Sequence, residues 1–276
     1  MQNQDSPAKA PRDRYLIEAV DRALTLMELL ADNPGLGVTE IAARMGVSKA
    51  LAFRLLHTLE RRDYVIRDPE HRSSALGYRL LHLADQIDRT NLIVSATRQH
   101  MDDLARLSRE DVNLFVRVGL NSFCIATRPS AHQVSMAPDL GVPGSLHVGG
   151  ASTVLVAYAP QNIQDAALAG EMEMLTPSTL TDPVRLRQRL EQVRADGFYV
   201  SRGDVDVSGF SIGVPVWGRG DVCIAAISLA GSLSRLAPET EAHYRVLLID
   251  YADRMSHALG GAESARRAAA RLATAS

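Results

Sequence analysis

The sequence predicts an α+β protein in which a small winged helix-turn-helix domain precedes a larger domain built on an antiparallel sheet. Two short helical patterns joined by a tight turn at Gly46-Val47 predict the first domain. Strand-like alternation that recurs in hairpin-connected runs between helical patterns predicts the second. We expect residues 14–84 to form the first domain, residues 85–100 a linking helix and residues 101–262 the second domain.

Composition narrows the class of protein. The chain has 276 residues, is 46% hydrophobic and 22% charged, and carries a formal net charge of -2. It can bury a sizeable core, and nucleic acid would have to bind a local basic patch rather than a global positive field. Residues 1–11 lack the apolar segment of a secretory signal, and the longest largely apolar run, 222–230, is too short to cross a bilayer. We predict a cytoplasmic protein with no membrane partner.

The N-terminal elements are predicted from apolar spacing and helix caps. Residues 1–13 lack apolar periodicity and are expected to be disordered. A first helix has an apolar stripe that recurs every three or four residues until Asn33-Pro34-Gly35 stops it. A second, short helix is expected to begin with Thr39 as its cap and to end at Gly46.

The next elements are the third helix and the wing, which complete the expected domain, and the helix that links it to the second domain. Ser48 is predicted to cap a third helix that runs to about Arg61. Residues 64–67 alternate like a strand and Asp68-Pro69-Glu70 turns the chain, which indicates a two-stranded wing. Residues 77–100 have few helix breakers and predict one long helix that links the domains and packs in a dimer.

The second half mixes strand and helix patterns. Apolar alternation predicts strands at residues 112–118, 123–127, 198–206, 210–217 and 222–230. Short or amphipathic helical patterns cover residues 149–158, the stretch from Asp182-Pro183 to Gly197, and a last segment that begins at Pro238. Residues 265–276 are expected to fray.

A local basic patch coincides with the predicted helix-turn-helix. Between Ile41 and Leu80 eight positive and four negative side chains give a net charge of +4, so the rest of the chain sums to -6. This asymmetry is typical of a DNA-binding module joined to a sensor domain. The residues predicted to meet double-stranded DNA lie on the third helix, at the two helix caps and on the wing: Thr39, Ser48, Lys49, Ala50, Phe53, Arg54, His57, Arg67 and Arg72.

Across about residues 14–260 the chain resembles the IclR family of transcriptional regulators. The matching stretches include Thr39-Glu40-Ile41-Ala42, Arg54-Leu55-Leu56-His57-Thr58-Leu59-Glu60, Leu76-Gly77-Tyr78-Arg79-Leu80 and Arg194-Ala195-Asp196-Gly197-Phe198. The resemblance implies a winged helix-turn-helix, a linker helix and a GAF-like effector domain. It also implies homodimers or homotetramers that bind palindromic promoter sites. We expect no cofactor.

The chain departs from the family pattern at three places, one of which is the loop after Gly197, often acidic in the family, which here reads Ser201-Arg202-Gly203-Asp204. Ala50 and Leu51 stand where the family usually has Ser-Thr, so contacts to phosphate are expected to shift toward Ser48, Lys49 and Arg54. Ser211 stands where many members carry Cys, so the identity of the effector cannot be borrowed from the family.

A ligand pocket is expected between the strands around Ser211 and Ser228, because small side chains on facing surfaces leave room and offer hydroxyl groups. By resemblance the pocket is lined by Met136, Gly150, Ala151, Ser201, Ser211 and Ser228, and we add His147. Gly149-Gly150 before a short helix is expected to present free backbone N–H groups to a carboxylate. With few acids nearby, these donors predict a small organic or aromatic acid as effector.

Other functions fit the sequence less well. Gly209-Phe210-Ser211-Ile212-Gly213 fits the G-x-S-x-G pattern of esterases, but that motif needs a helix after the serine, and here a strand is predicted. His132 and His147 have no partner at metal-ligand spacing, and Cys124 and Cys223 lie in apolar strands as inert residues. We expect neither enzyme nor metal site. The remaining alternative is a GAF-like sensor that acts through protein partners.

Overall fold

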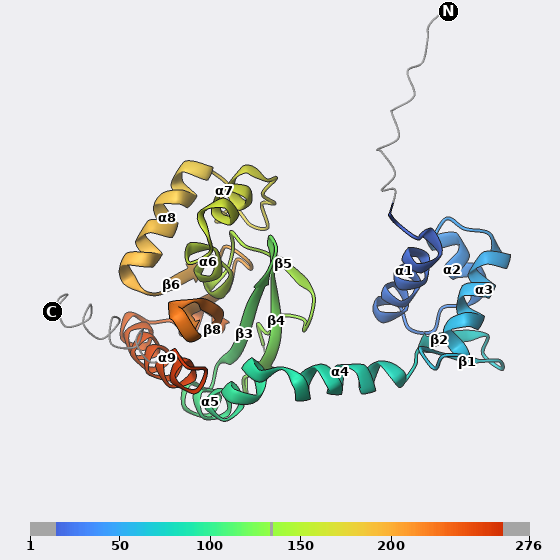
Figure 1. Ribbon diagram of the computed structural model, residues 1–276, viewed down its shortest axis with the longest axis horizontal. Coiled ribbons are helices and arrows are strands. Elements are labelled where there is room, and N and C mark those ends of the chain that lie inside the picture. Colours follow the sequence, from blue (N-terminus) through green and yellow to red (C-terminus); the bar gives the residue numbers. More distant parts are fainter. Residues whose placement is uncertain (1–14, 133–134, 262–276) are drawn as a thin grey trace, which may run out of the picture. The chain divides into compact units, whose positions relative to one another are not determined.

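A computed structural model of the chain describes residues 15–132 and 135–261, and it divides into two compact units, Met1–Thr90 and Asn91–Ser276 (Figure 1). The predictions of a disordered arm at 1–13 and a frayed tail at 265–276 lie outside the described residues. Within the described residues, no helix has both the length and the apolar character needed to cross a membrane.

The first unit is a winged helix-turn-helix followed by one more helix. It comprises α1 (Glu18–Asp32), α2 (Val38–Arg44), α3 (Lys49–Glu60), the antiparallel pair β1 (Val65–Asp68) and β2 (Ser73–Leu76), and α4 (Arg79–Thr90). Its core joins all three N-terminal helices to the wing, through buried side chains such as Leu26, Ile41, Leu56 and Val65. The predicted helices and wing are therefore confirmed.

One helix cap was predicted wrongly. Thr39 lies inside α2, whose cap is Gly37, because the Glu40 carboxylate reaches back and accepts the Gly37 backbone N–H at 2.9 Å. The Ser48 cap is confirmed, since its hydroxyl accepts the Leu51 backbone N–H at 3.2 Å.

The single helix predicted over residues 77–100 is two helices. α4 ends at Thr90, and the Asn91 side chain accepts the backbone N–H groups of Ile93 (3.0 Å) and Val94 (3.3 Å), which begins α5 (Leu92–Ser108). The division between the two units falls at this residue. An asparagine is a strong cap, and that signal outweighs the continuous apolar spacing.

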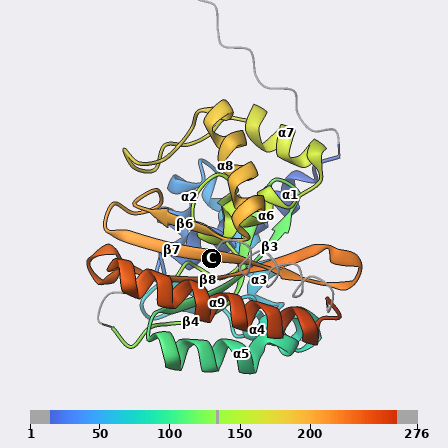
Figure 2. The same cartoon turned by 90° about the vertical axis from the view of Figure 1, so that its left-hand side faces the viewer.

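The second unit is a six-stranded antiparallel sheet in the order β5-β4-β3-β8-β7-β6, with helices on both faces (Figure 2). The strands are β3 (Asp111–Val118), β4 (Asn121–Arg128), β5 (Pro143–Ser145), β6 (Tyr199–Arg202), β7 (Gly209–Trp217) and β8 (Cys223–Ser232). The helices are α5, α6 (Gly150–Ala157), α7 (Gln161–Ala169), α8 (Pro183–Asp196) and α9 (Pro238–Ala258). This confirms the expected α+β class and the antiparallel sheet.

Two apolar layers sandwich the sheet. On one face α5 and α9 bury Met101, Leu104 and Leu248 against alternate residues of β3, β7 and β8. On the other face α6, α7 and α8 pack together around Val154, Leu168 and Leu190. The sequence missed α7 and β5, and it extended the strand at 198–206 past its true end at Arg202. The loop that follows β6 carries Asp204 and Asp206.

Candidate functional sites

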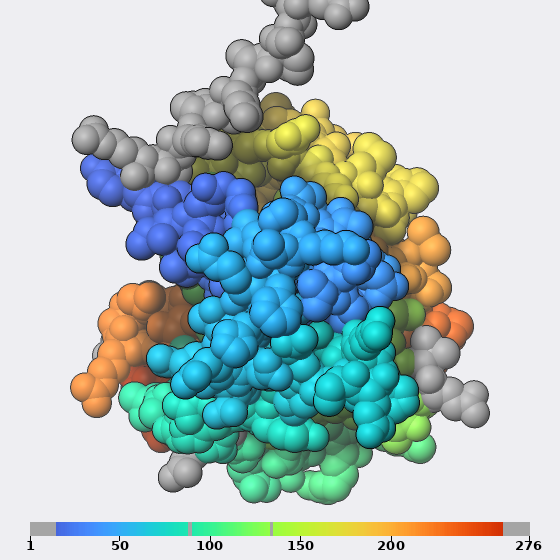
Figure 3. Space-filling model, turned by 90° about the vertical axis from the view of Figure 1, so that its right-hand side faces the viewer, coloured from blue at the N-terminus to red at the C-terminus, as the bar shows by residue number. Residues whose placement is uncertain are grey.

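The exposed face of α3 carries the DNA-binding residues predicted on this helix. Ala52, Leu55, Leu56 and Leu59 point into the core of the first unit, which leaves Lys49, Ala50, Phe53, Arg54 and His57 exposed. Ser48, at the start of the helix, and Thr39, on α2, are also exposed. Figure 3 looks onto this unit, with α3 in light blue at the surface.

The wing supplies two more of the predicted cations. Arg72 is exposed in the turn between β1 and β2, in a left-handed backbone conformation with φ 49°. Arg67 on β1 instead turns toward α3, where its Nη1 lies 3.4 Å from a Glu60 carboxylate oxygen. Its guanidinium also lies 5.1 Å from the centre of the Phe53 ring. The structure thus joins wing and helix at Arg67.

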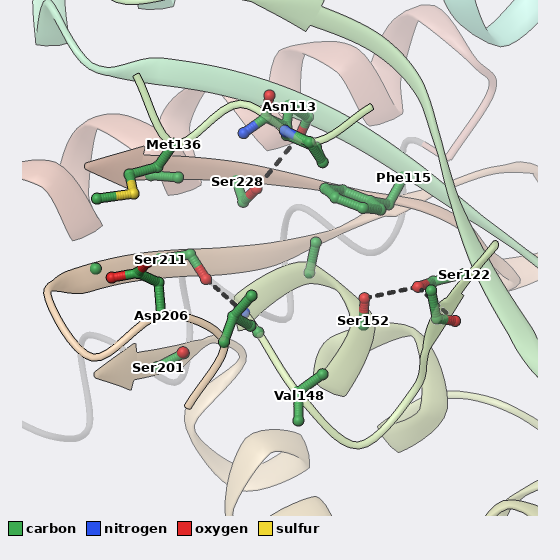
Figure 4. Close-up of a pocket in the computed structure, with 18 of the residues that line it drawn as sticks. Asn113, Phe115, Ser122, Met136, Val148, Ser152, Ser201, Asp206, Ser211 and Ser228 are labelled. Atoms are coloured by element: carbon green, nitrogen blue, oxygen red, sulfur yellow. Dashed lines mark hydrogen bonds between the residues drawn. The ribbon is translucent and has the colours of Figure 1, made fainter. Parts of the chain in front are cut away.

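The second unit encloses a cavity of about 270 Å³ between the sheet and the start of α6 (Figure 4). Met136, Gly150, Ala151, Ser201, Ser211 and Ser228 all line it, as expected from the sequence. The buried Asp111 carboxylate accepts the backbone N–H groups of Met136 and Ser130 (2.6 Å) and the Ser135 hydroxyl (2.9 Å). These hydrogen bonds hold the segment that brings Met136 to the cavity. His147 does not line the cavity, since its ring donates to the Glu173 carbonyl at 3.0 Å and is 91% buried.

The sequence missed several lining residues, including Asn113, Phe115, Ser122, Ser152 and Asp206. Asn113 is 1% exposed in the middle of β3, and its side-chain oxygen accepts the Thr127 hydroxyl at 2.7 Å. A polar amide inside an apolar strand was the signal that could have found it, because buried polar groups need partners. Ser122 and Ser152 share a hydrogen bond of 2.8 Å across the cavity wall (Figure 4).

The Gly149 and Gly150 backbone N–H groups at the start of α6 are already paired, which corrects one prediction. Gly149 donates to both carboxylate oxygens of Asp204 at 3.3 Å, and Gly150 donates to Ser211 Oγ at 2.6 Å. The Ser201 hydroxyl also donates to Asp204, which is 3% exposed. The expectation of free donors with few acids nearby was therefore wrong: a carboxylate of the chain itself occupies the helix N-terminus, where negative charge is favoured.

A second acid, Asp206, lines the cavity and is exposed. The hydroxyl of Ser208 and then its backbone N–H bond to this carboxylate and lower its pKa below the usual range. Asp206 is therefore ionised at neutral pH. None of the described lining residues is Lys, Arg or His.

The geometry gives little support to esterase, thiol or metal chemistry. Ser211 lies inside β7, which continues as a strand to Trp217, so the strand-to-helix turn of an esterase serine is missing at this position. Burial raises the pKa of Cys124 to about 11 and that of Cys223 to about 12, so both thiols stay protonated. Within residues 15–132 and 135–261, no cluster of three or more His, Cys, Asp or Glu side chains fits a metal ion.

Comparison with known proteins agrees with this architecture in both units. Residues 19–69 match the IclR helix-turn-helix domain, and residues 84–257 match the family described as bacterial transcriptional regulator IclR C-terminal. The chain is 26% identical to the HTH-type transcriptional repressor AllR of Klebsiella pneumoniae over 246 residues, which is 88% of this chain and 90% of that protein. The AllR repressor of Escherichia coli K12 is 27% identical over 245 residues, with the same coverage.

Solved structures show the same fold. The IclR regulator of Alicyclobacillus acidocaldarius superposes with a TM-score of 0.78 at 24% identity, over 89% of this chain and 100% of that one. An IclR homologue from Microbacterium hydrocarbonoxydans, complexed with 4-hydroxybenzoate, superposes with a TM-score of 0.76 at 21% identity, over 87% and 98% of the two chains. With both family domains matched in order over most of its length, this chain belongs to the IclR family of bacterial transcriptional regulators.

Proposed function

We propose that this protein is a ligand-responsive repressor of a catabolic operon, which binds a palindromic promoter site and senses a small organic or aromatic acid. The curated relatives described above are repressors. The proposal that the protein binds DNA rests on the exposed face of α3. On this face Lys49 and Arg54 lie beside apolar side chains, and the opposite face of the helix packs into the core. Such a helix fits the major groove.

Each predicted contact has a distinct task in this proposal. Arg54 reads or clamps the duplex, because its guanidinium can pair with guanine or with a phosphate. Lys49, Ser48, Thr39 and Arg72 meet phosphates, which positions the helix without reading sequence. Ala50, Phe53 and His57 face the base edges.

A palindromic site requires two copies of the domain, and the first unit has surfaces that suit self-association. Val20 and Leu24 on α1 are each 54% exposed, and Leu83 and Ile87 on α4 are 38% and 66% exposed. Apolar residues that recur on one face of a helix favour a partner of the same kind. We place the homodimer contact on these helices, with a tetramer formed by two such dimers.

The effector half rests on the cavity. Ser211 accepts the Gly150 N–H, so its own hydroxyl hydrogen is the donor it offers to a ligand. Ser228, with only a long bond of 3.5 Å to the Asn113 carbonyl, and the Asn113 amide add further donors (Figure 4). Phe115, Met136 and Val148 supply apolar walls. The acid's carboxylate belongs at the Asn113–Ser228 end, because Asp206 and Asp204 lie toward Ser211 and Ser201 and would repel it.

The experiment that tests the function is fluorescence anisotropy of the full-length protein with duplexes tiled across the promoters of its own gene and of the neighbouring operons, at 50 to 200 mM salt. We expect one tile to bind more tightly than the others. We also expect its affinity to fall about a thousandfold over this range, because several phosphates are neutralised. A sensor that acts only through protein partners would bind no tile preferentially, and that result would overturn the proposal.

The effector arm uses calorimetry with benzoate, 4-hydroxybenzoate and pyruvate as probes. Binding of at least one acid, with release of the preferred tile, is the expected result. If the protein binds the tile but no member of a broad panel of carboxylates, the proposed repressor function stands and the proposed acid effector is refuted.

A further inference from the structure

Phe53 is a large apolar side chain that the core of the first unit does not use. It lies on the exposed face of α3 with 48% of its surface accessible, whereas Leu55, Leu56 and Leu59 of the same helix are buried. A single exposed apolar residue is ordinary, so exposure alone assigns no role to it. Its surroundings do.

Two neighbouring side chains hold the Phe53 ring in one place. The Arg67 guanidinium lies 5.1 Å from the ring centre and is itself anchored to Glu60 at 3.4 Å. The His57 ring, one helical turn later, lies parallel to it within 3°, with the ring centres 6.2 Å apart. The ring is therefore contacted by Arg67 from the wing and by His57 along its own helix. A side chain that is already ordered loses little entropy when it binds.

The charge around this ring determines what it can meet. Ala50, one turn earlier, is also exposed, so Ala50 and Phe53 make a small apolar spot on a helix face that also carries the cations Lys49 and Arg54. Phosphates will be drawn to the cations and gain nothing from the apolar spot. In the major groove, the apolar group that a base edge offers is the C5-methyl of thymine.

We infer that Phe53 is a specificity-determining residue that reads a thymine methyl group in each half-site, and that Arg67 is a positioning residue that holds the ring. This inference rests on the proposed function and deepens it. It reassigns Arg67, because a guanidinium engaged by Phe53 and Glu60 serves the ring rather than a flanking phosphate.

The test begins with selection of binding sites from randomised duplexes by the full-length wild-type protein and by Phe53→Ala. Both are expected to yield a palindrome, and the variant is expected to lose the preference for thymine at one symmetric pair of positions. Each thymine of the wild-type site is then replaced by deoxyuridine, which deletes only the methyl group.

For wild type, uracil at that pair is expected to weaken binding about three- to tenfold per half-site, and uracil at the other thymines serves as the matched control. In Phe53→Ala the same replacement is expected to cost nothing further. This coupling separates a contact from a structural effect, because a misfolded variant would lose affinity equally for both duplexes. Arg67→Ala is expected to weaken the coupling without abolishing it.

Identical selected sites for wild type and Phe53→Ala would overturn the inference and leave the proposed function standing. If Phe53→Ala binds too weakly for selection, the deoxyuridine replacements in the wild-type complex decide. If no replacement lowers the affinity at least threefold, the inference is overturned. Failure of the wild-type protein to select any site would overturn the proposed function itself.

Discussion

Gly150 and Gly213 bring the start of helix α6 into direct backbone contact with strand β7. A Cβ atom on Gly213 would lie 2.3 Å from the Gly150 carbonyl carbon and 2.4 Å from its oxygen. A Cβ atom on Gly150 would lie 2.7 Å from the Gly213 backbone nitrogen. The cavity wall is thus built where two backbones touch, and no side chain fits between them.

Substitution at this contact is expected to destabilise the second unit. Gly213→Ala forces the backbones apart and should lower the free energy of unfolding by about 3 kcal/mol, in the range of severe overpacking. Urea denaturation measures it. Gly170→Ala is the matched control, because an added Cβ there meets its nearest atom at 3.6 Å, an ordinary contact. Equal stability of the two variants would contradict the contact.

Ser211→Ala removes the acceptor of the Gly150 N–H. We expect a loss of about 1 to 2 kcal/mol of stability, because a buried donor is left without a partner. Binding of an acid that carries a hydrogen-bond acceptor at the end opposite its carboxylate, such as 4-hydroxybenzoate, should weaken at least fivefold by calorimetry. Ser145→Ala, at an exposed lining serine, should leave stability nearly unchanged. Hydrolysis of p-nitrophenyl acetate that disappeared with Ser211→Ala would instead reveal an esterase.

Asp206→Asn tests the charge of the effector. The Asp206 carboxylate lines the cavity and its lowered pKa keeps it ionised, so an anionic ligand approaches against repulsion. Its removal should tighten binding of an acid about two- to fivefold at low salt, with a smaller gain at 0.5 M salt because the side chain is exposed. Asp196→Asn, at an exposed acid at the end of α8 that does not line the cavity, should have no such effect. Weaker acid binding in Asp206→Asn would indicate that the effector donates a hydrogen bond there.

Arg54→Ala is expected to weaken binding of the preferred promoter tile at least tenfold and to leave acid binding in the second unit unchanged. If Arg54 contacts a phosphate, the slope of log affinity against log salt should also fall by about one. Arg44→Ala is a suitable control, because this arginine lies on α2 and its guanidinium bonds to the Asn33 side chain. An Arg54→Ala protein with wild-type operator affinity at physiological salt would refute the docking of α3.

Asp253 on α9 gives the protein a predictable pH dependence. Burial, and then the charge of Asp250, raise the pKa of Asp253 to about 6. Because the folded-state pKa is above the unfolded value near 3.9, this residue favours folding below about pH 4 and opposes it as the pH rises through 6.

Asp253→Asn should therefore stabilise the protein by about 1 kcal/mol at pH 7.5, a value reduced for partial exposure, and raise the melting temperature by about 2 to 4 °C. At pH 4 the two proteins should melt together. A gain of the same size at both pH values would show that charge is not the cause.

The sequence predicted those elements whose signals are local. The Ser48 and Asp182 caps and the left-handed Gly197 at the end of α8 are each set by residues within four positions. Alternation in β3, β7 and β8 also predicted which side chains face the core, because each strand is apolar on the face that α5 and α9 cover.

What the sequence could not predict depends on distant partners. Gly149 and Asp204 are separated by 55 positions, so no spacing rule indicates that this carboxylate takes the Gly149 N–H. The position of His147 follows similarly from the Glu173 carbonyl. Asn91 is the opposite case: its cap is a local signal, but the apolar spacing on either side of it favours one continuous helix.

The Asp204 carboxylate ties the start of α6 to strand β6. From the loop that follows β6 it accepts both the Gly149 backbone N–H and the Ser201 hydroxyl. Removal of this carboxylate would release the helix start and the strand end together, so the shape of the cavity wall depends on a side chain that does not itself line the cavity.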